Sequence, residues 1–176
     1  FFDVQRPKNK LSALLALLRQ RRDKTGIVYC ATRASAESVC EALCEAGISA
    51  VCYHAGMEDD ARRRSQEDFQ FDRKSVIVAT NAFGMGIDKP DVRFVAHYAM
   101  CDSLESYYQE AGRAGRDGVR SYALLLTSPD DGGRIIKRFE QEFPPLEKIK
   151  DIYEKVCSYL QIGIGDGAEA SVLFNI

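Results

Sequence analysis

The sequence predicts an α/β protein built on a doubly wound parallel sheet, with a short helical extension at its C-terminal end. Two observations lead to this prediction. Between residues 26 and 128, short and continuously apolar runs alternate with helix-like stretches, as is typical of a parallel sheet that helices cover on both faces. After Pro129 this alternation stops and two helical patterns follow. We therefore expect one domain over 1–128, and over 129–176 a helical extension with the start of a truncated following subdomain.

Local patterns predict the elements in chain order. Leucines at helical spacing predict a first helix over 10–19, and basic residues follow at its C-terminal end. The apolar run 26–30 predicts a strand, after which Thr32 or Ser35 caps a helix that Gly47 ends. The same patterns repeat further along and predict strands over 49–53, 75–79, 93–98 and 121–126 and helices over 57–71, 103–113, 130–141 and 146–161.

Charge and hydropathy exclude several classes of protein. The chain has 176 residues, with 24 Lys and Arg against 26 Asp and Glu, for a formal net charge of −2. A near-neutral protein does not coat nucleic acid by bulk electrostatics, so any such contact comes from a local basic patch. No apolar run approaches the roughly 20 residues of a membrane span, and the first residues lack the zones of a signal peptide. We expect a cytoplasmic protein with no membrane partner.

The cysteines and histidines indicate packing more than chemistry. The six cysteines form no C-x-x-C pair and several lie in apolar runs, where reduced cysteine behaves as a small buried hydrophobic residue. Cys40 and Cys44 lie one helical turn apart, but no second pair accompanies them to complete a tetrahedral zinc site. We therefore predict free thiols and no metal site.

His97 ends an apolar strand and is expected to be packed and hydrogen-bonded rather than a general base. For His54 the packed and the functional interpretations stay open.

In doubly wound sheets the chemistry gathers in loops at the carboxyl ends of the strands. The loop 80–91 follows one such strand and contains Gly84 and Gly86, which allow a close approach of the backbone to a partner. Its Asp88 offers a carboxylate that can hold hydroxyl groups such as those of a ribose. The alternative is a turn-rich connection without function, since short glycine motifs often arise by chance.

A second stretch, 106–118, contains Arg113 and Arg116, each preceded by a glycine. Three residues apart at a helix end, the two guanidinium groups would project on one side. Their mutual repulsion is offset if a phosphate lies between them, because arginine matches phosphate oxygens with two hydrogen bonds. The alternative is a solvated surface pair. The sequence contains no G-x-x-x-x-G-K-[ST] loop, so the phosphate cradle is expected in another domain.

Four stretches together resemble the second RecA-like domain of superfamily-two helicases: the strand 27–30, the turn 53–57, and the loops 76–91 and 106–118. The sequences AFGMGIDKP over 82–90 and YYQEAGRAGR over 107–116 are similar to the RecQ family of ATP-dependent DNA helicases in particular. A DEAD-box RNA helicase would be expected to have His at Gln109 and Arg at Glu110. The resemblance covers residues 1–128 and implies a RecA-like fold of the P-loop NTPase helicase C-terminal type.

The resemblance also implies roles for individual residues. Arg113 and Arg116 match the arginine fingers that reach the ATP phosphates across an interdomain cleft, and Gln109 opens the same motif. Asp88 matches the carboxylate that contacts the ribose, with Gly86 beside it. The residues that match contacts to the DNA backbone are Thr80 and, more loosely, Arg33 and the turn that begins at His54.

The function that the resemblance implies is a fragment of a 3′ to 5′ DNA helicase of the RecQ type, with a role in DNA repair and recombination. The helicase would act on single-stranded and forked DNA and would use ATP with Mg²⁺, held mainly by an N-terminal RecA-like domain outside this chain. The fragment alone would be inactive. In a bacterium it would associate with the nucleoid. The alternatives are a binding or interaction module without motor activity, and an RNA helicase or double-strand translocase.

Two features depart from the family pattern. RecQ proteins commonly continue into a cysteine-bearing zinc subdomain, whereas residues 129–176 contain only Cys157. Cys101 stands where the family pattern leads us to expect proline after the strand that ends near His97.

Overall fold

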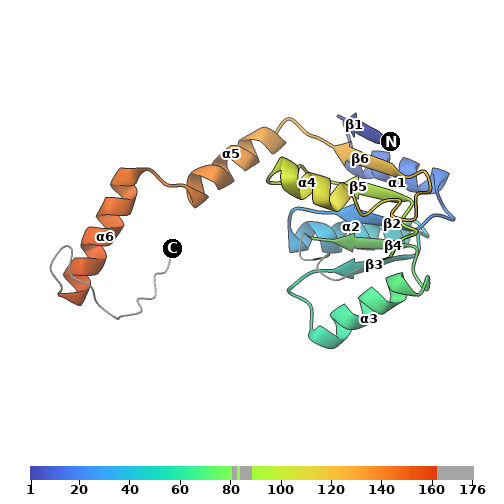
Figure 1. The fold of residues 1–176 in the computed structure, drawn as a ribbon, viewed down its shortest axis with the longest axis horizontal. Coiled ribbons are helices and arrows are strands. Elements are labelled where there is room, and N and C mark those ends of the chain that lie inside the picture. The colour runs from blue at the N-terminus through green and yellow to red at the C-terminus, as the bar shows by residue number, and fades with distance from the viewer. Residues whose placement is uncertain (81–82, 84–88, 162–176) are drawn as a thin grey trace. The chain divides into compact units, whose positions relative to one another are not determined.

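Six strands form one parallel sheet among the residues that the structure describes. The structure is a computed structural model, and it describes residues 1–80, 83 and 89–161. Within them the strands lie in the order β1-β6-β5-β2-β4-β3, and all five neighbouring pairs are parallel. The predicted doubly wound sheet is confirmed. The strands are β1 Phe2–Gln5, β2 Gly26–Tyr29, β3 Ala50–Tyr53, β4 Val76–Ala79, β5 Phe94–His97 and β6 Tyr122–Leu126, as Figure 1 shows.

Helices connect the strands close to the predicted positions. Asn9 and Thr32 each accept a hydrogen bond at a helix start, from the backbone N–H groups of Ser12 and Ser35. Of the two caps proposed for the second helix, Thr32 is therefore the one used. The helices are α1 Lys10–Gln20, α2 Arg33–Glu45, α3 Asp59–Gln70, α4 Leu104–Ala111, α5 Asp131–Glu142 and α6 Leu146–Leu160.

The sequence prediction missed one strand, β1. It pairs in parallel with β6, with Phe2 opposite Ala123 and Gln5 opposite Leu126. As an edge strand it keeps most of its side chains exposed, so it lacks the continuous apolar run that identifies the inner strands. Its partner lies about 120 residues later, a distance that no local pattern reports.

Alternate residues of each strand pack on opposite faces of the sheet. One face, with Val28, Val78 and Ala96, packs against apolar residues of α1 and α2. The other face, with Ile27, Ile77 and Val95, packs against Phe69 of α3 and against Phe83. α4 lies on this second face, because Tyr107 contacts the ring of His97. The inner strands therefore carry apolar residues toward both faces, as the continuous runs predicted.

The chain divides into two compact units, Phe1–Asp131 and Gly132–Ile176. A buried ion pair closes the first unit: the Lys10 ammonium group lies 2.9 Å from Asp131 and donates to the Tyr98 carbonyl at 3.1 Å. Asp131 also accepts from the Ser128 backbone N–H at 2.7 Å. The start of α1, the end of β5 and the start of α5 are thus joined. Among the described residues, no helix has the length and apolar content that crossing a membrane requires.

Candidate functional site

The strands β3, β4, β2 and β5 end level with one another. Tyr29 is paired with both Ala79 and His97, and Ala79 is paired with Tyr53. The loops that follow these strands therefore leave the same edge of the sheet, as expected for parallel strands. Three predicted site residues, Thr80, Arg33 and His54, come after three of these strand ends.

The structure brings Arg33 and the turn 54–57 together. Gly56 lies so close to the Arg33 side chain that an added Cβ would stand 2.9 Å from its Nη1 and 3.0 Å from its Cδ. Thr80 lies next to the same region, since its backbone N–H donates to the Tyr53 carbonyl at 3.3 Å. Thr80 is only 7% exposed. A basic side chain, a turn backbone and a hydroxyl-bearing residue thus meet at one end of the sheet.

His54 is turned inward in this arrangement. The residue is 5% exposed. Its Nδ1 accepts a hydrogen bond from the Gly56 N–H at 3.2 Å, and its Nε2 lies 2.9 Å from a carboxylate oxygen of Glu37 in α2. Both ring nitrogens are therefore occupied within the protein. Of the two interpretations that the sequence left open for His54, the packed one describes its geometry.

The arginine-bearing segment differs from the prediction in two respects. α4 ends at Ala111, two residues earlier than expected, so Arg113 and Arg116 lie in turns after the helix and the spacing rule for helical side chains does not apply. The segment also does not follow a strand's carboxyl end: it follows α4 and is bonded to residues just before β5, since Gly115 N–H donates to the Val92 carbonyl at 2.9 Å. Gly115 has φ +71°, and a Cβ there would stand 2.8 Å from the Val119 carbonyl oxygen. A glycine is needed here for the turn itself.

Arg93 stabilises the position of the segment 112–118. Its Nε donates to the Asp91 carbonyl at 2.9 Å and its Nη1 to the Val119 carbonyl at 3.3 Å. Its Nη2 forms an ion pair with Asp117, and this hydrogen bond lowers the pKa of the Asp117 carboxyl. A second backbone bond, from Asp117 N–H to the Pro90 carbonyl at 3.3 Å, ties the same turn to the residues before β5.

Lys89 holds the end of the preceding loop, a role that the sequence analysis missed. Its Nζ lies 2.8 Å from Asp72 and 3.1 Å from Asp91, and the residue is 6% exposed. Burial acts to lower the pKa of Lys89, but its bonds to the two carboxylates outweigh burial and raise it. The segment that contains the predicted residues Gly86 and Asp88 lies outside the described residues.

Arg113 is half-buried beside Tyr29 rather than facing outward. The Tyr29 hydroxyl donates to the Phe83 carbonyl at 3.1 Å. Burial raises the pKa of Tyr29, and the neighbouring Arg113 guanidinium opposes that rise. The Nε of Arg113 is buried and has no hydrogen-bond acceptor among the described residues. Arg116 is exposed, so the two arginines differ in their surroundings.

Gln109 lies on the exposed side of α4. Its amide nitrogen donates to the Glu105 carboxylate one helical turn earlier, at 3.3 Å. Tyr107 is half-buried and Tyr108 is 74% exposed, so the two adjacent aromatic side chains have different surroundings.

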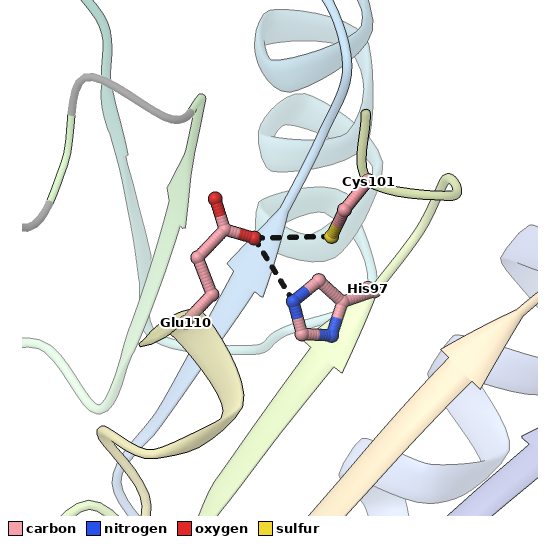
Figure 2. A group of neighbouring side chains, drawn as sticks. All are labelled: His97, Cys101 and Glu110. Carbon is pink, nitrogen blue, oxygen red and sulfur yellow. Dashed lines mark hydrogen bonds and ion pairs between the residues drawn. The ribbon is translucent and has the colours of Figure 1, made fainter. Parts of the chain in front are cut away.

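The residue after Gln109 belongs to a cluster that the sequence did not indicate. Glu110 accepts hydrogen bonds from His97 Nε2 at 3.0 Å and from the Cys101 thiol at 3.3 Å, as Figure 2 shows. His97 is fully buried between the rings of Tyr29 and Tyr107. The prediction that His97 is packed and hydrogen-bonded is confirmed. Burial raises the pKa of the Cys101 thiol, and the Glu110 carboxylate raises it further.

Sequence comparison identifies the class of domain. Residues 9–118 match the family of the helicase conserved C-terminal domain, and the chain belongs to that family. Its relatives make the assignment narrower. It is 46% identical over 169 residues to the ATP-dependent DNA helicase RecQ of Haemophilus influenzae, and 48% identical over 138 residues to that of Bacillus subtilis. It is therefore a helicase C-terminal domain of the RecQ type.

The alignments cover most of this chain but only a small part of each relative. The alignments cover 96% and 78% of this chain but only 26% and 23% of the two relatives, so the chain spans about a quarter of their length. Among solved structures, it is similar to the Escherichia coli DEAD-box protein SrmB, with TM-score 0.65 and 28% identity over 72% of this chain and 75% of that one. The C-terminal domain of the DEAD-box protein Dbp5, at 22% identity and TM-score 0.63 over 88% of this chain and 94% of that one, shares the fold.

Proposed function

We propose that this chain is the second motor domain of an ATP-dependent DNA helicase of the RecQ type, and that it is inactive without a first domain. Its RecQ relatives are named ATP-dependent DNA helicases. The sequence has no phosphate-cradling G-x-x-x-x-G-K-[ST] loop. ATP and Mg²⁺ would then be held mainly by the first domain, and this chain would contribute Arg113 and Arg116 to the phosphates.

One observation carries this proposal: the arginine segment is fixed, yet the buried Nε of Arg113 has no acceptor within the part of the chain that the structure describes. Backbone bonds to Pro90 and Val92 and the Arg93–Asp117 ion pair hold the segment. A buried N–H without an acceptor costs about 1–3 kcal/mol, and a small shift of the guanidinium toward an anion would remove that cost. Charge that develops on a transferring phosphoryl group is the kind of anion that a guanidinium stabilises.

For the DNA we propose contact through Arg33, Thr80 and the backbone of the turn at Gly56. The imidazole of His54 would act indirectly, because its bonds to Gly56 and Glu37 hold the turn against α2. Contacts of this kind go to phosphate oxygens, so they hold a strand without reading its sequence. Single-stranded and forked DNA remain the proposed substrates, and Asp88 with Gly86 the proposed ribose contact.

The arginine assignment is tested by ATP turnover in the full-length protein. Arg116→Ala should lower the DNA-stimulated rate by about 10³-fold or more, the magnitude typical of an arginine finger. Arg116→Lys should restore little, because an ammonium group cannot form two parallel bonds to phosphate. The matched control is Arg63→Ala, which removes an exposed arginine of α3 that pairs with Asp60 at 3.4 Å. An unchanged rate in Arg116→Ala would exclude the finger role.

The substrate is tested by comparing single-stranded DNA, duplex DNA and RNA as activators of the same protein. Single-stranded DNA should stimulate ATP turnover most. Arg33→Ala should weaken DNA binding and reduce the salt dependence of the DNA affinity by the amount expected for about one phosphate contact. Stronger stimulation by RNA or by duplex would favour the RNA helicase or the translocase. Robust ATPase activity of the isolated chain would contradict the division of the site between two domains.

A further inference from the structure

Three side chains of different chemistry converge at one point beside α4. His97 comes from the end of β5, Cys101 from the loop after it, and Glu110 from the last turn of α4. The ligand atoms of the three residues all lie within 4.8 Å of one another. Figure 2 shows a Glu110 carboxylate oxygen directed toward both the imidazole and the thiol. The geometry points to a binding site for one divalent transition-metal ion of the zinc type, with these three residues as its protein ligands.

The distances are close to those that such an ion requires. Zinc bonds of about 2.0–2.3 Å at tetrahedral angles place neighbouring ligand atoms about 3.3–3.6 Å apart. His97 Nε2 and Cys101 Sγ already lie 3.0 Å and 3.3 Å from the same Glu110 oxygen. For these two pairs, side-chain rotations that move the atoms by a few tenths of an ångström would give the required spacing. The third pair, His97 Nε2 and Cys101 Sγ, lies within 4.8 Å, and rotation of the Cys101 side chain would adjust it. Three protein ligands leave the fourth position to water.

The donor types select the class of ion. Imidazole and thiolate favour zinc and its neighbours in the transition series over magnesium or calcium, which prefer oxygen ligands throughout. On binding, the Cys101 thiol loses its proton to solvent and the thiolate takes its place in the coordination shell. The thiolate and the Glu110 carboxylate together then balance the two positive charges of the ion. Cys101 is half-buried, which leaves a route of entry for the ion.

The ring of His97 sets a limit on the affinity. A histidine that binds metal through Nε2 carries its hydrogen on Nδ1 and usually donates it to an acceptor. The Nδ1 of His97 is buried and has no hydrogen-bond partner among the described residues. Loss of such a second partner typically weakens metal binding by about 10- to 100-fold. The site should therefore bind metal reversibly, as an accessory to a domain that folds without it.

A bound ion would join β5, the loop 98–102 and α4. Glu110 lies directly after Gln109 and three residues before Arg113, so the ion would fix the helix end from which the arginine segment leaves. The site involves neither nucleotide nor DNA, so its test is independent of the proposed helicase function.

Cobalt binding tests the site, because a thiolate bound to Co²⁺ gives a charge-transfer absorption that a hydrogen-bonded thiol does not. The full chain should bind one Co²⁺ with this absorption, and Zn²⁺ should displace it. Cys101→Ser should abolish the absorption, and Glu110→Gln should weaken binding by at least about 10-fold. Cys44→Ser, which removes an exposed thiol elsewhere, is the matched control and should leave binding unchanged.

Circular dichroism of each variant establishes that it is folded, and Cys101→Ser, a small change at a half-buried position, keeps the test interpretable. If the folded wild type shows no thiolate absorption with Co²⁺, the three residues form a hydrogen-bond network only and the proposal is overturned. The same conclusion follows if the absorption survives in Cys101→Ser or is lost in Cys44→Ser.

Discussion

Gly26 and Phe94 are expected to be strongly coupled in the core. They lie opposite each other on the adjacent strands β2 and β5, and the Phe94 ring covers the glycine. A Cβ at position 26 would stand 2.0 Å from Cζ and 2.2 Å from Cε2 of that ring. Gly26→Ala therefore forces a movement of the aromatic ring, whatever the backbone conformation.

The size of this effect follows from the distances and the burial. Ordinary contact begins at 3.4 Å, so the ring has to move by about 1.4 Å. Phe94 is fully buried in the core that faces α1 and α2, where overpacking costs typically about 1–3 kcal/mol. Because the clash involves three ring atoms, we expect about 3 kcal/mol of lost stability.

A double-mutant cycle separates this clash from other effects. Phe94→Leu alone should cost about 1–2 kcal/mol through lost burial, and it also makes space for the alanine. The double variant should then be more stable than the sum of the two losses implies, by about 1–2 kcal/mol.

Urea unfolding of the full chain, followed by circular dichroism, measures all four free energies. The matched control is Gly133→Ala in α5, where an added Cβ meets no atom within 4 Å and should cost nothing. The reasoning fails if Gly26→Ala lies within about 0.5 kcal/mol of the wild type, or if the two losses are simply additive.

Two further predictions concern charged contacts. Asp131→Asn should cost about 3 kcal/mol, because it removes one partner of a buried ion pair whose Lys10 side chain is 15% exposed. The bonds from Lys10 and Ser128 outweigh burial and lower the pKa of Asp131. The contribution of Asp131 to the free energy of unfolding is therefore complete above the ordinary pKa of 3.8 and declines as the pH falls through the lower folded value. The stabilities of wild type and variant should converge in acid, and a difference that stays constant in urea titrations across pH would contradict this. Asp117→Asn should release Arg93 and loosen the arginine segment, lowering ATP turnover of the full-length protein by up to about 10²-fold with little change in melting temperature, whereas an unchanged rate would show that the pair does not position the arginines.

Much of the fold could be predicted from the sequence because the inner strands carry their own signal. The strands β2, β4 and β5 are buried at every residue and almost entirely apolar, since helices cover both faces of the sheet. Helix starts also carry a local signal: Ser103 opens the helix predicted over 103–113, and its hydroxyl accepts from the Ser106 N–H at 3.0 Å. Such signals are local, so they can be recognised in the sequence without knowledge of the tertiary structure.

The candidate site was predictable only in part. The stretch with Arg113 and Arg116 was identified by its residue types, but its attachment to Val92 and Pro90 was not, because those bonds join segments more than 20 residues apart. The helix was expected to continue to 113, and instead it ends at Ala111 before a turn that Gly115 makes possible. A helix end set by backbone bonds to another segment leaves little trace in the local sequence.

The sequence by itself therefore determined the class of fold and the family, because both depend on apolar periodicity and on short motifs of fixed spacing. Only the tertiary structure decided the contacts: β1 beside β6, His54 turned toward Glu37, and Arg113 beside Tyr29. It also brought His97, Cys101 and Glu110 to one point. The physical reason is that parallel strands and the helix that returns across them place distant residues side by side, and the resulting geometry is a property of the packing rather than of any one segment.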